Sequence, residues 1–179
     1  MQHTDEALLS VVVLERGASW PPWLAEYQKY APDSIVVAQS ADESGIEFAS
    51  RIARKSDEIE HHESAIHAGL LVCNGAVDEA SSVCRKKICA SLLRVMLLKQ
   101  RGELVLVADL RASDQARQEL FTLAGMLCDG LNGTSVTVRV RFDTIRPTSA
   151  VSGVMKTATP TSLREEAQAA IERTSHGSR

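Results

Sequence analysis

The chain has 179 residues, of which 44% are hydrophobic, 24% charged and 4% aromatic, and its formal net charge is −3. This length suits one domain with a sizeable core, and the hydrophobic fraction excludes a chain that is disordered throughout. No stretch approaches the ~20 apolar residues of a membrane span, and the near-neutral charge argues against general nucleic-acid binding. The acidic first residues lack the basic region of a secretory signal, so we expect a cytoplasmic protein.

Short apolar runs alternate along the chain with longer amphipathic segments. The runs predict strands at 10–14, 34–38, 69–73, 103–108 and 135–142, and the segments predict helices at about 22–30, 44–63, 78–100 and 113–131. Asp78 and Ser113 are suited to cap two of the helices, and Gly102 and Gly133 follow helix ends. The pattern predicts an α/β fold, a three-layer α/β/α sandwich whose five-stranded, mostly parallel sheet has a Rossmann-like or flavodoxin-like order.

The fifth predicted strand differs from the others because valines alternate strictly with polar residues. One face of such a strand is buried and the other is wet, which places it at an edge of the sheet. The domain is therefore predicted to span 1–143. Residues 144–179 are rich in Ser, Thr and Pro and predict a flexible tail, with one short helix at 162–173 introduced by a capping-box pattern.

Polar side chains follow the first four predicted strands, where α/β proteins bind ligands. These loops supply the candidate ligand-binding residues Glu15, Arg16, Gln39, Asn74, Asp109 and Arg111. If the protein is an enzyme, Glu15 and Asp109 are its acid/base candidates and Arg16 and Arg111 its anion anchors. The alternative interpretation is that the loops are solvated and that their charges form structural ion pairs.

Phosphate-binding signatures are absent from the sequence. There is no Gly-x-x-x-x-Gly-Lys-Ser/Thr string, and only Gly17 stands where a dinucleotide fingerprint would follow the first strand. In size and alternation the chain resembles the universal stress proteins. The resemblance is architectural only, because their glycine-rich phosphate signature has no counterpart around Gly130 and Gly133. No cofactor is predicted.

The histidines and cysteines do not match metal or catalytic patterns. His61, His62 and His67 lie near one another in sequence, but five positions separate His62 from His67, which turns the two rings about 140° apart on a helix. We expect no metal site. The four cysteines (Cys73, Cys84, Cys89 and Cys128) have no zinc spacing and predict small buried hydrophobes in a reducing compartment, with Cys73 as the alternative reactive thiol.

Two regions suggest surfaces for self-association. Trp20 and Trp23 flank two prolines and suit an interface, a ligand lid or a hydrophobic plug. An edge strand exposes unpaired backbone groups, so Val138, Arg139 and Arg141 predict pairing with a second copy, although arginines can also protect an edge. The helix predicted at 78–100 is apolar beyond one stripe, which indicates a central position or a second subunit.

The residues favour a small cytoplasmic binding or regulatory protein without enzymatic activity, homodimeric and related to stress response. The alternative is an enzyme that binds a small molecule or nucleotide with its strand-end loops, its catalytic residues unknown. A concave site that held Glu15, Asp109 and both loop arginines, with a raised carboxylate pKa, would favour the enzyme.

Overall fold

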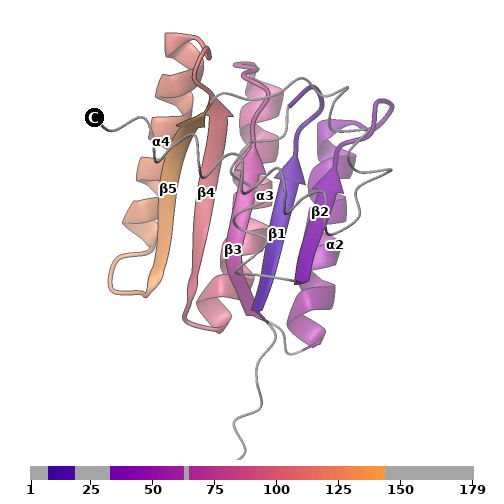
Figure 1. The fold of residues 1–179 in the computed structure, drawn as a ribbon, viewed down its shortest axis with the longest axis vertical. Coiled ribbons are helices and arrows are strands. Elements are labelled where there is room, and N and C mark those ends of the chain that lie inside the picture. Colours follow the sequence, from indigo (N-terminus) through magenta and orange to yellow (C-terminus); the bar gives the residue numbers. More distant parts are fainter. Residues whose placement is uncertain (1–7, 19–32, 63–64, 144–179) are drawn as a thin grey trace, which may run out of the picture.

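The computed structural model describes residues 8–18, 33–62 and 65–143, which form a sheet of five parallel strands and three helices (Figure 1). In chain order the elements are β1 (Leu8–Leu14), β2 (Asp33–Ala38), α2 (Gly45–His61), β3 (Ala65–Val72), α3 (Glu79–Leu98), β4 (Gly102–Asp109), α4 (Asp114–Gly130) and β5 (Val136–Asp143). The α/β prediction is confirmed. Each described helix begins with a side-chain cap, from Ser44, Asp78 and Ser113 respectively.

The strands are arranged in the order β2-β1-β3-β4-β5, with every neighbouring pair parallel. This is the flavodoxin-like doubly wound order, which settles the choice that the sequence left open. Within the sheet, β2 lies next to β1 on one side and β3 lies next to β1 on the other side. The topological switch point therefore lies between the carboxyl ends of β1 and β3.

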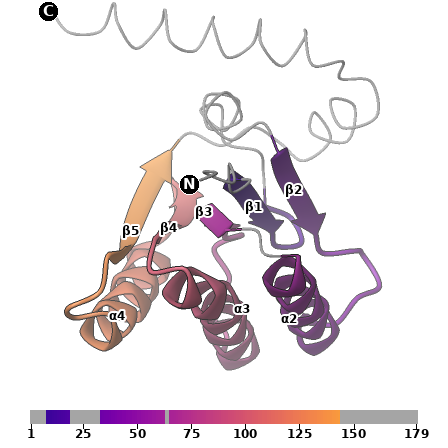
Figure 2. The same cartoon turned by 90° about the horizontal axis from the view of Figure 1, so that it is seen from below.

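Helices α2, α3 and α4 cover one face of the sheet (Figure 2). The larger apolar core lies between this face and the helices, and α3 occupies its centre, as the apolar composition of that segment indicated. A second cluster on the opposite face includes the buried side chains of Val12, Leu70 and Val107. The helices predicted at 22–30 and 162–173, the rest of the tail, Trp20 and Trp23 lie outside the described residues.

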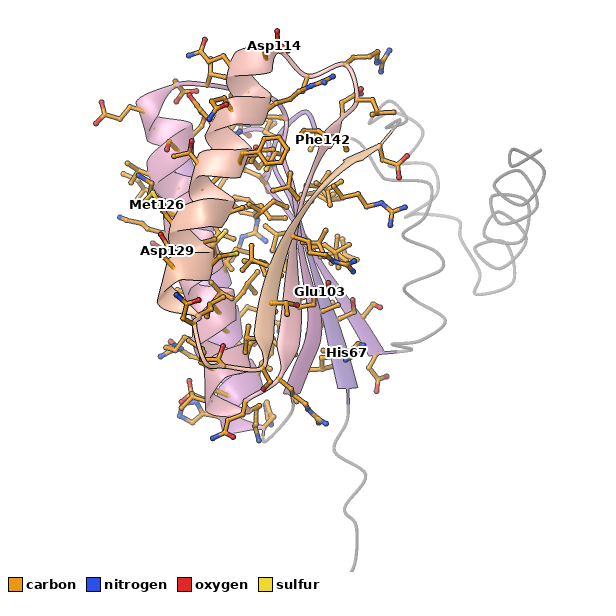
Figure 3. The ribbon with its side chains drawn as sticks, turned by 90° about the vertical axis from the view of Figure 1, so that its left-hand side faces the viewer. His67, Glu103, Asp114, Met126, Asp129 and Phe142 are labelled. Carbon is orange, nitrogen blue, oxygen red and sulfur yellow. The ribbon has the colours of Figure 1, made fainter. Side chains whose placement is uncertain are left out.

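The third strand begins earlier than the sequence predicted, at Ala65 rather than Gly69. Ala65 and Ile66 are already buried against the core, and His67, which the register between β1 and β3 skips, is exposed. His67 lies on the sheet face away from the helices (Figure 3), whereas His61 and His62 lie at the end of α2. In the described part of the chain, no three His, Cys, Asp or Glu side chains are grouped to hold a metal ion.

A glycine is required where α3 turns into β4. Gly102 has φ +139°, and a Cβ at this position would lie 2.7 Å from the carbonyl oxygen of Ile66 and 2.6 Å from Cγ of Met96. A side chain here would meet backbone that cannot move without disturbing β3.

Among the described helices, none is both long and apolar enough to cross a membrane.

Strand β5 forms one edge of the sheet and pairs only with β4 among the described strands. The predicted alternation is confirmed: Thr137, Arg139 and Arg141 are exposed, whereas the valines between them are half-buried. Arg139 forms an ion pair with Glu103 of β4, and Arg141 lies 3.4 Å from the carboxylate of Asp143. The arginines thus have acidic partners within their own chain.

Candidate functional site

A cleft of about 750 Å³ opens at the carboxyl ends of β1, β2 and β3, between the first turns of α2 and α3. It lies beside the topological switch point, where open α/β sheets bind their ligands. Four of the six predicted ligand-binding residues line it: Glu15, Arg16, Gln39 and Asn74. The sequence therefore located the polar lining that follows the strands, because parallel strands bring their following loops to one edge of the sheet. The polar lining from the helix starts was not predicted as part of a site: Ser44, Asp78, Glu79 and Ser81.

The other two predicted residues, Asp109 and Arg111, lie in the loop after β4 and do not line the cleft. Arg111 donates from its backbone N–H to Oδ1 of Asp109 at 2.8 Å and from Nη2 to Oδ2 at 3.0 Å. This side-chain hydrogen bond lowers the pKa of Asp109. Asp109 and Arg111 thus form an ion pair within their own loop, as expected from the alternative interpretation that the loop charges form structural ion pairs. The carboxyl group of Asp109 does not have the raised pKa of a general acid.

The floor of the cleft rests on a buried ion pair between Glu15 and Arg85. Nε of Arg85 donates to Oε1 of Glu15 at 2.6 Å, and Nη2 donates to Oε2 at 2.9 Å. This two-pronged arrangement fixes the orientation of the planar guanidinium and of the planar carboxylate. Arg85 is only 3% exposed and Glu15 only 8%. Burial is the largest influence and lowers the pKa of Arg85, but the hydrogen bond to Glu15 and the nearby acidic groups together outweigh it, so the pKa is raised.

The same arginine ties the loop after β3 into place. Nη1 of Arg85 donates to the carbonyl of Ala76 at 2.8 Å, and the backbone N–H of Asn74 donates to Oε2 of Glu15 at 2.9 Å. The side-chain amide of Asn74 donates to the carbonyl of Arg16 at 2.7 Å. Both oxygens of Glu15 are therefore engaged, and the loops that follow β1 and β3 are fixed relative to each other.

Sequence reasoning placed Arg85 near the start of a helix but did not give it a role. The available signal was its spacing: Arg85 precedes Ile88, Cys89 and Leu92 by three, four and seven positions, so it shares their buried face. A lone cation on an apolar stripe needs an anionic partner. The sequence does not say which carboxylate that is, because Glu15 is 70 positions away.

Arg16 and Gln39 form the side of the cleft nearest β2. Oε1 of Gln39 accepts the backbone N–H of Arg16 at 3.1 Å, and Nε2 of Gln39 donates to the carbonyl of Glu43 at 3.0 Å. The guanidinium of Arg16 donates to the carbonyls of Ser40 and Glu43. These contacts hold the loop after β2 against the loop after β1.

The remaining lining is mostly apolar and comes from the two helices, with Ile46 and Phe48 from α2 and Val83, Cys84 and Ile88 from α3. The helices approach closely here, because a Cβ on Gly45 would lie 2.5 Å from Sγ of Cys84. An apolar wall opposite a set of convergent polar groups is typical of small-molecule sites.

The cysteines are only partly as predicted. Cys73 and Cys89 are buried, but Cys84 is half-buried and Cys128 is exposed, because α4 turns it toward solvent beside β5. Burial raises the pKa of Cys73 well above its ordinary value and that of Cys89 to about 12. Burial also raises the pKa of Cys84. None of these three thiols has the lowered pKa of a nucleophile, including Cys73, the reactive candidate.

Comparison with known proteins yields no family. No protein-family model matches the sequence, and no curated protein matches it. Among solved structures, a ribose-5-phosphate isomerase from Brucella melitensis 16M matches with TM-score 0.46 and 12% identity over 73% of this chain, which spans 66% of the isomerase.

Two short-chain oxidoreductases also match. A metagenomic enzyme in complex with NADP has TM-score 0.46 and 11% identity over 84% of this chain and 92% of its own. A short-chain dehydrogenase from Streptomyces avermitilis has TM-score 0.44 and 9% identity over 99% and 100%. The chain is an α/β protein with a parallel five-stranded sheet.

Proposed function

We propose that this chain is a cytoplasmic binding protein that holds a small molecule in the cleft between α2 and α3 and acts in regulation rather than catalysis. The observation that carries the proposal is the cleft itself, at the switch point of the sheet, with an apolar wall and a polar floor. Its floor is rigidly built, since Arg85, Glu15 and Asn74 join the loops of β1 and β3. Preorganised sites of this kind bind with little ordering cost.

The alternative, an enzyme, has less support from the same residues. Its two acid/base candidates do not meet in one site, since Glu15 lines the cleft and Asp109 does not. The carboxylate of Glu15 is paired with Arg85, and that of Asp109 is paired with Arg111. A side chain that acts as general acid or base must lie within hydrogen-bond reach of the substrate proton that it transfers. We therefore favour binding.

The test is retention of metabolites by the full chain. The wild-type protein is dialysed against a small-molecule extract of the source cells, and retained compounds are identified by mass spectrometry. Val83→Trp places an indole ring in the cleft from an exposed helix position and should abolish the enrichment. Leu98→Trp, at the exposed far end of the same helix, is the matched control and should retain it. Equal enrichment by both variants would contradict the proposal.

We also propose that the protein is a homodimer that associates through the edge formed by α4 and β5. Phe121 of α4 is 53% exposed and packs on Phe142 of β5, with ring centroids 5.6 Å apart. The half-buried Val138 and Val140 continue this apolar seam along the edge strand. A second copy would cover both the seam and the open strand edge, and the arginines of β5 are already neutralised within the chain.

Sedimentation at tens of micromolar tests the dimer. Phe121→Asp should give a monomer, because it puts a charge on the seam. Met126→Asp is the matched control: Met126 is 55% exposed on the same helix, points away from the sheet (Figure 3), and should leave the dimer intact. A wild-type protein that sediments as a monomer would contradict this proposal.

A further inference from the structure

We propose that the segment 162–173 docks as an amphipathic helix on β3 and β4, on the sheet face opposite α2, α3 and α4. The proposal concerns how the sheet is completed and does not depend on the ligand of the cleft. Three observations support it: a buried apolar cluster on that face, the limited reach of the connection between β1 and β2, and an apolar stripe in the C-terminal sequence.

The apolar cluster on this face is buried, although the described helices all lie on the other face (Figure 2). Leu70 and Val107 are 0% exposed and Val105 is 2% exposed. On a sheet face that nothing covers, side chains stand out from the pleat into water, so a valine there cannot be fully buried. The element that covers β3 and β4 must therefore come from outside the described ranges. It ends before β5, where the side chain of Arg139 is 64% exposed on the same face.

The connection between β1 and β2 reaches only part of this face. A right-handed crossover would place it on this side of the sheet, over the two strands that it joins. Neighbouring strands lie about 4.8 Å apart, so in the order β2-β1-β3-β4 a helix centred between β1 and β2 lies about 12 Å from β4. The radius of a helix with its side chains is about 5–6 Å. Strand β4 therefore needs a second covering element.

The C-terminal sequence contains a segment that fits this position. A capping-box pattern opens it at Ser162 and Glu165, and apolar residues then recur at helical spacing. Four of them share one side of the predicted helix: Leu163, Ala167, Ala170 and Ile171. A stripe this thin does not stabilise a short helix in isolation, because helical stability in proteins comes mostly from packing of the apolar side. The buried cluster on β3 and β4 supplies that packing.

The length of the C-terminal sequence and the place where it begins agree with this position. Strand β5, the neighbour of β4, ends at Asp143, and 36 residues follow it. The residues from 144 to 161 can span up to about 60 Å, far more than the roughly 15 Å across three strand spacings. A helix over 162–173 is about 18 Å long, enough to cover Val105 and Val107, which lie two positions apart on β4.

Two variants of the full-length chain that add the same two charges test the proposal. Leu163→Asp/Ile171→Asp places the charges on the apolar stripe and should lower the melting temperature by about 5 °C or more, because two docked side chains lose their apolar contacts. Gln168→Asp/Ala169→Asp is the matched control. It places the charges on the other side of the predicted helix and should lower the melting temperature by less than about 2 °C.

Methyl NMR of the same variants gives the location of the contact. Leu163→Asp/Ile171→Asp should shift the methyl signals of Leu70, Val105 and Val107, on the docking face, more than those of leucines in the core beneath the helices. The control should leave all of these signals in place. If the double Asp variant does not fold, Leu163→Ala/Ile171→Ala removes the same contacts without charge and should give the same shifts.

Three results would overturn the proposal. Equal melting temperatures of the stripe variant and its control would show that the stripe makes no contact. Unshifted methyl signals of Val105 and Val107 in the stripe variant would assign the covering element to residues 19–32 instead. Shifts of these signals when the wild-type protein is diluted would assign it to a second copy of the chain.

Discussion

Replacing Arg85 by methionine should destabilise the protein more than any other single change at the site. The substitution leaves the carboxylate of Glu15, which is 8% exposed, without its partner and removes donors to Glu15 and Ala76. Breaking a buried ion pair from one side costs about 3–5 kcal/mol. The expected loss in the free energy of unfolding is therefore about 3–5 kcal/mol, a large share of the 5–15 kcal/mol of a typical domain.

A double-mutant cycle separates the buried charge from simple loss of packing. With Glu15→Gln already in place, the buried guanidinium of Arg85 has lost its close carboxylate partner. Arg85→Met then removes that charge, so it should cost at most about 1–2 kcal/mol, the value of the hydrogen bonds lost. Arg85→Lys keeps the charge without the two-pronged geometry and should be intermediate. The assay is urea unfolding followed by far-ultraviolet circular dichroism. The same cost for Arg85→Met in both backgrounds would show that the buried charge of Glu15 is not the source of the loss.

Further predictions concern packing and pH. Gly102→Ala should cost more than about 2 kcal/mol because of its positive φ and the backbone beside it, whereas Gly125→Ala, in open space within α4, should stabilise by about 0.5–1 kcal/mol; thermal unfolding of both variants decides. Gly45→Ala should destabilise the wild type by about 1 kcal/mol but be neutral or stabilising together with Cys84→Ala, which removes the sulfur that the new Cβ would meet; equal effects in both backgrounds would exclude this contact. The hydrogen bond from its partner Arg51 lowers the pKa of Glu43 below 4.5, so the stabilising effect of this carboxylate is present above pH 4.5 and disappears as the pH falls through the lowered value. Glu43→Gln should therefore destabilise more at pH 7 than at pH 3, as measured by urea unfolding at both pH values.

The fold was predictable because its signals are local. Continuous Val, Ile and Leu runs mark buried parallel strands, and the caps at Asp78 and Ser113 are readable from residue type alone. The early start of β3 was missed because Ala65 and His67 are weak strand formers, and because the register with β1 skips His67, so this segment has no regular alternation.

The site was predictable in part. Glu15, Arg16, Gln39 and Asn74 could be found because each follows a strand, and parallel topology gathers such residues. Which loops share one cleft depends on strand order, which the sequence left open, so Asp109 could not be excluded in advance. The pairing of Arg85 with Glu15 depends on how α3 packs on the sheet, a tertiary relation that spacing within one helix does not encode.

We propose that a small molecule binds in the cleft between α2 and α3, and this can be measured residue by residue. The direct measurement is a nitrogen-15 NMR titration of the full-length protein with the compound most enriched in dialysis. We expect the largest shifts on the amides around the cleft, those of Arg16, Asn74, Ala76 and Ser81, and we expect them to vanish in Val83→Trp. Shifts confined to α4 and β5, or shifts that persist unchanged in Val83→Trp, would contradict it.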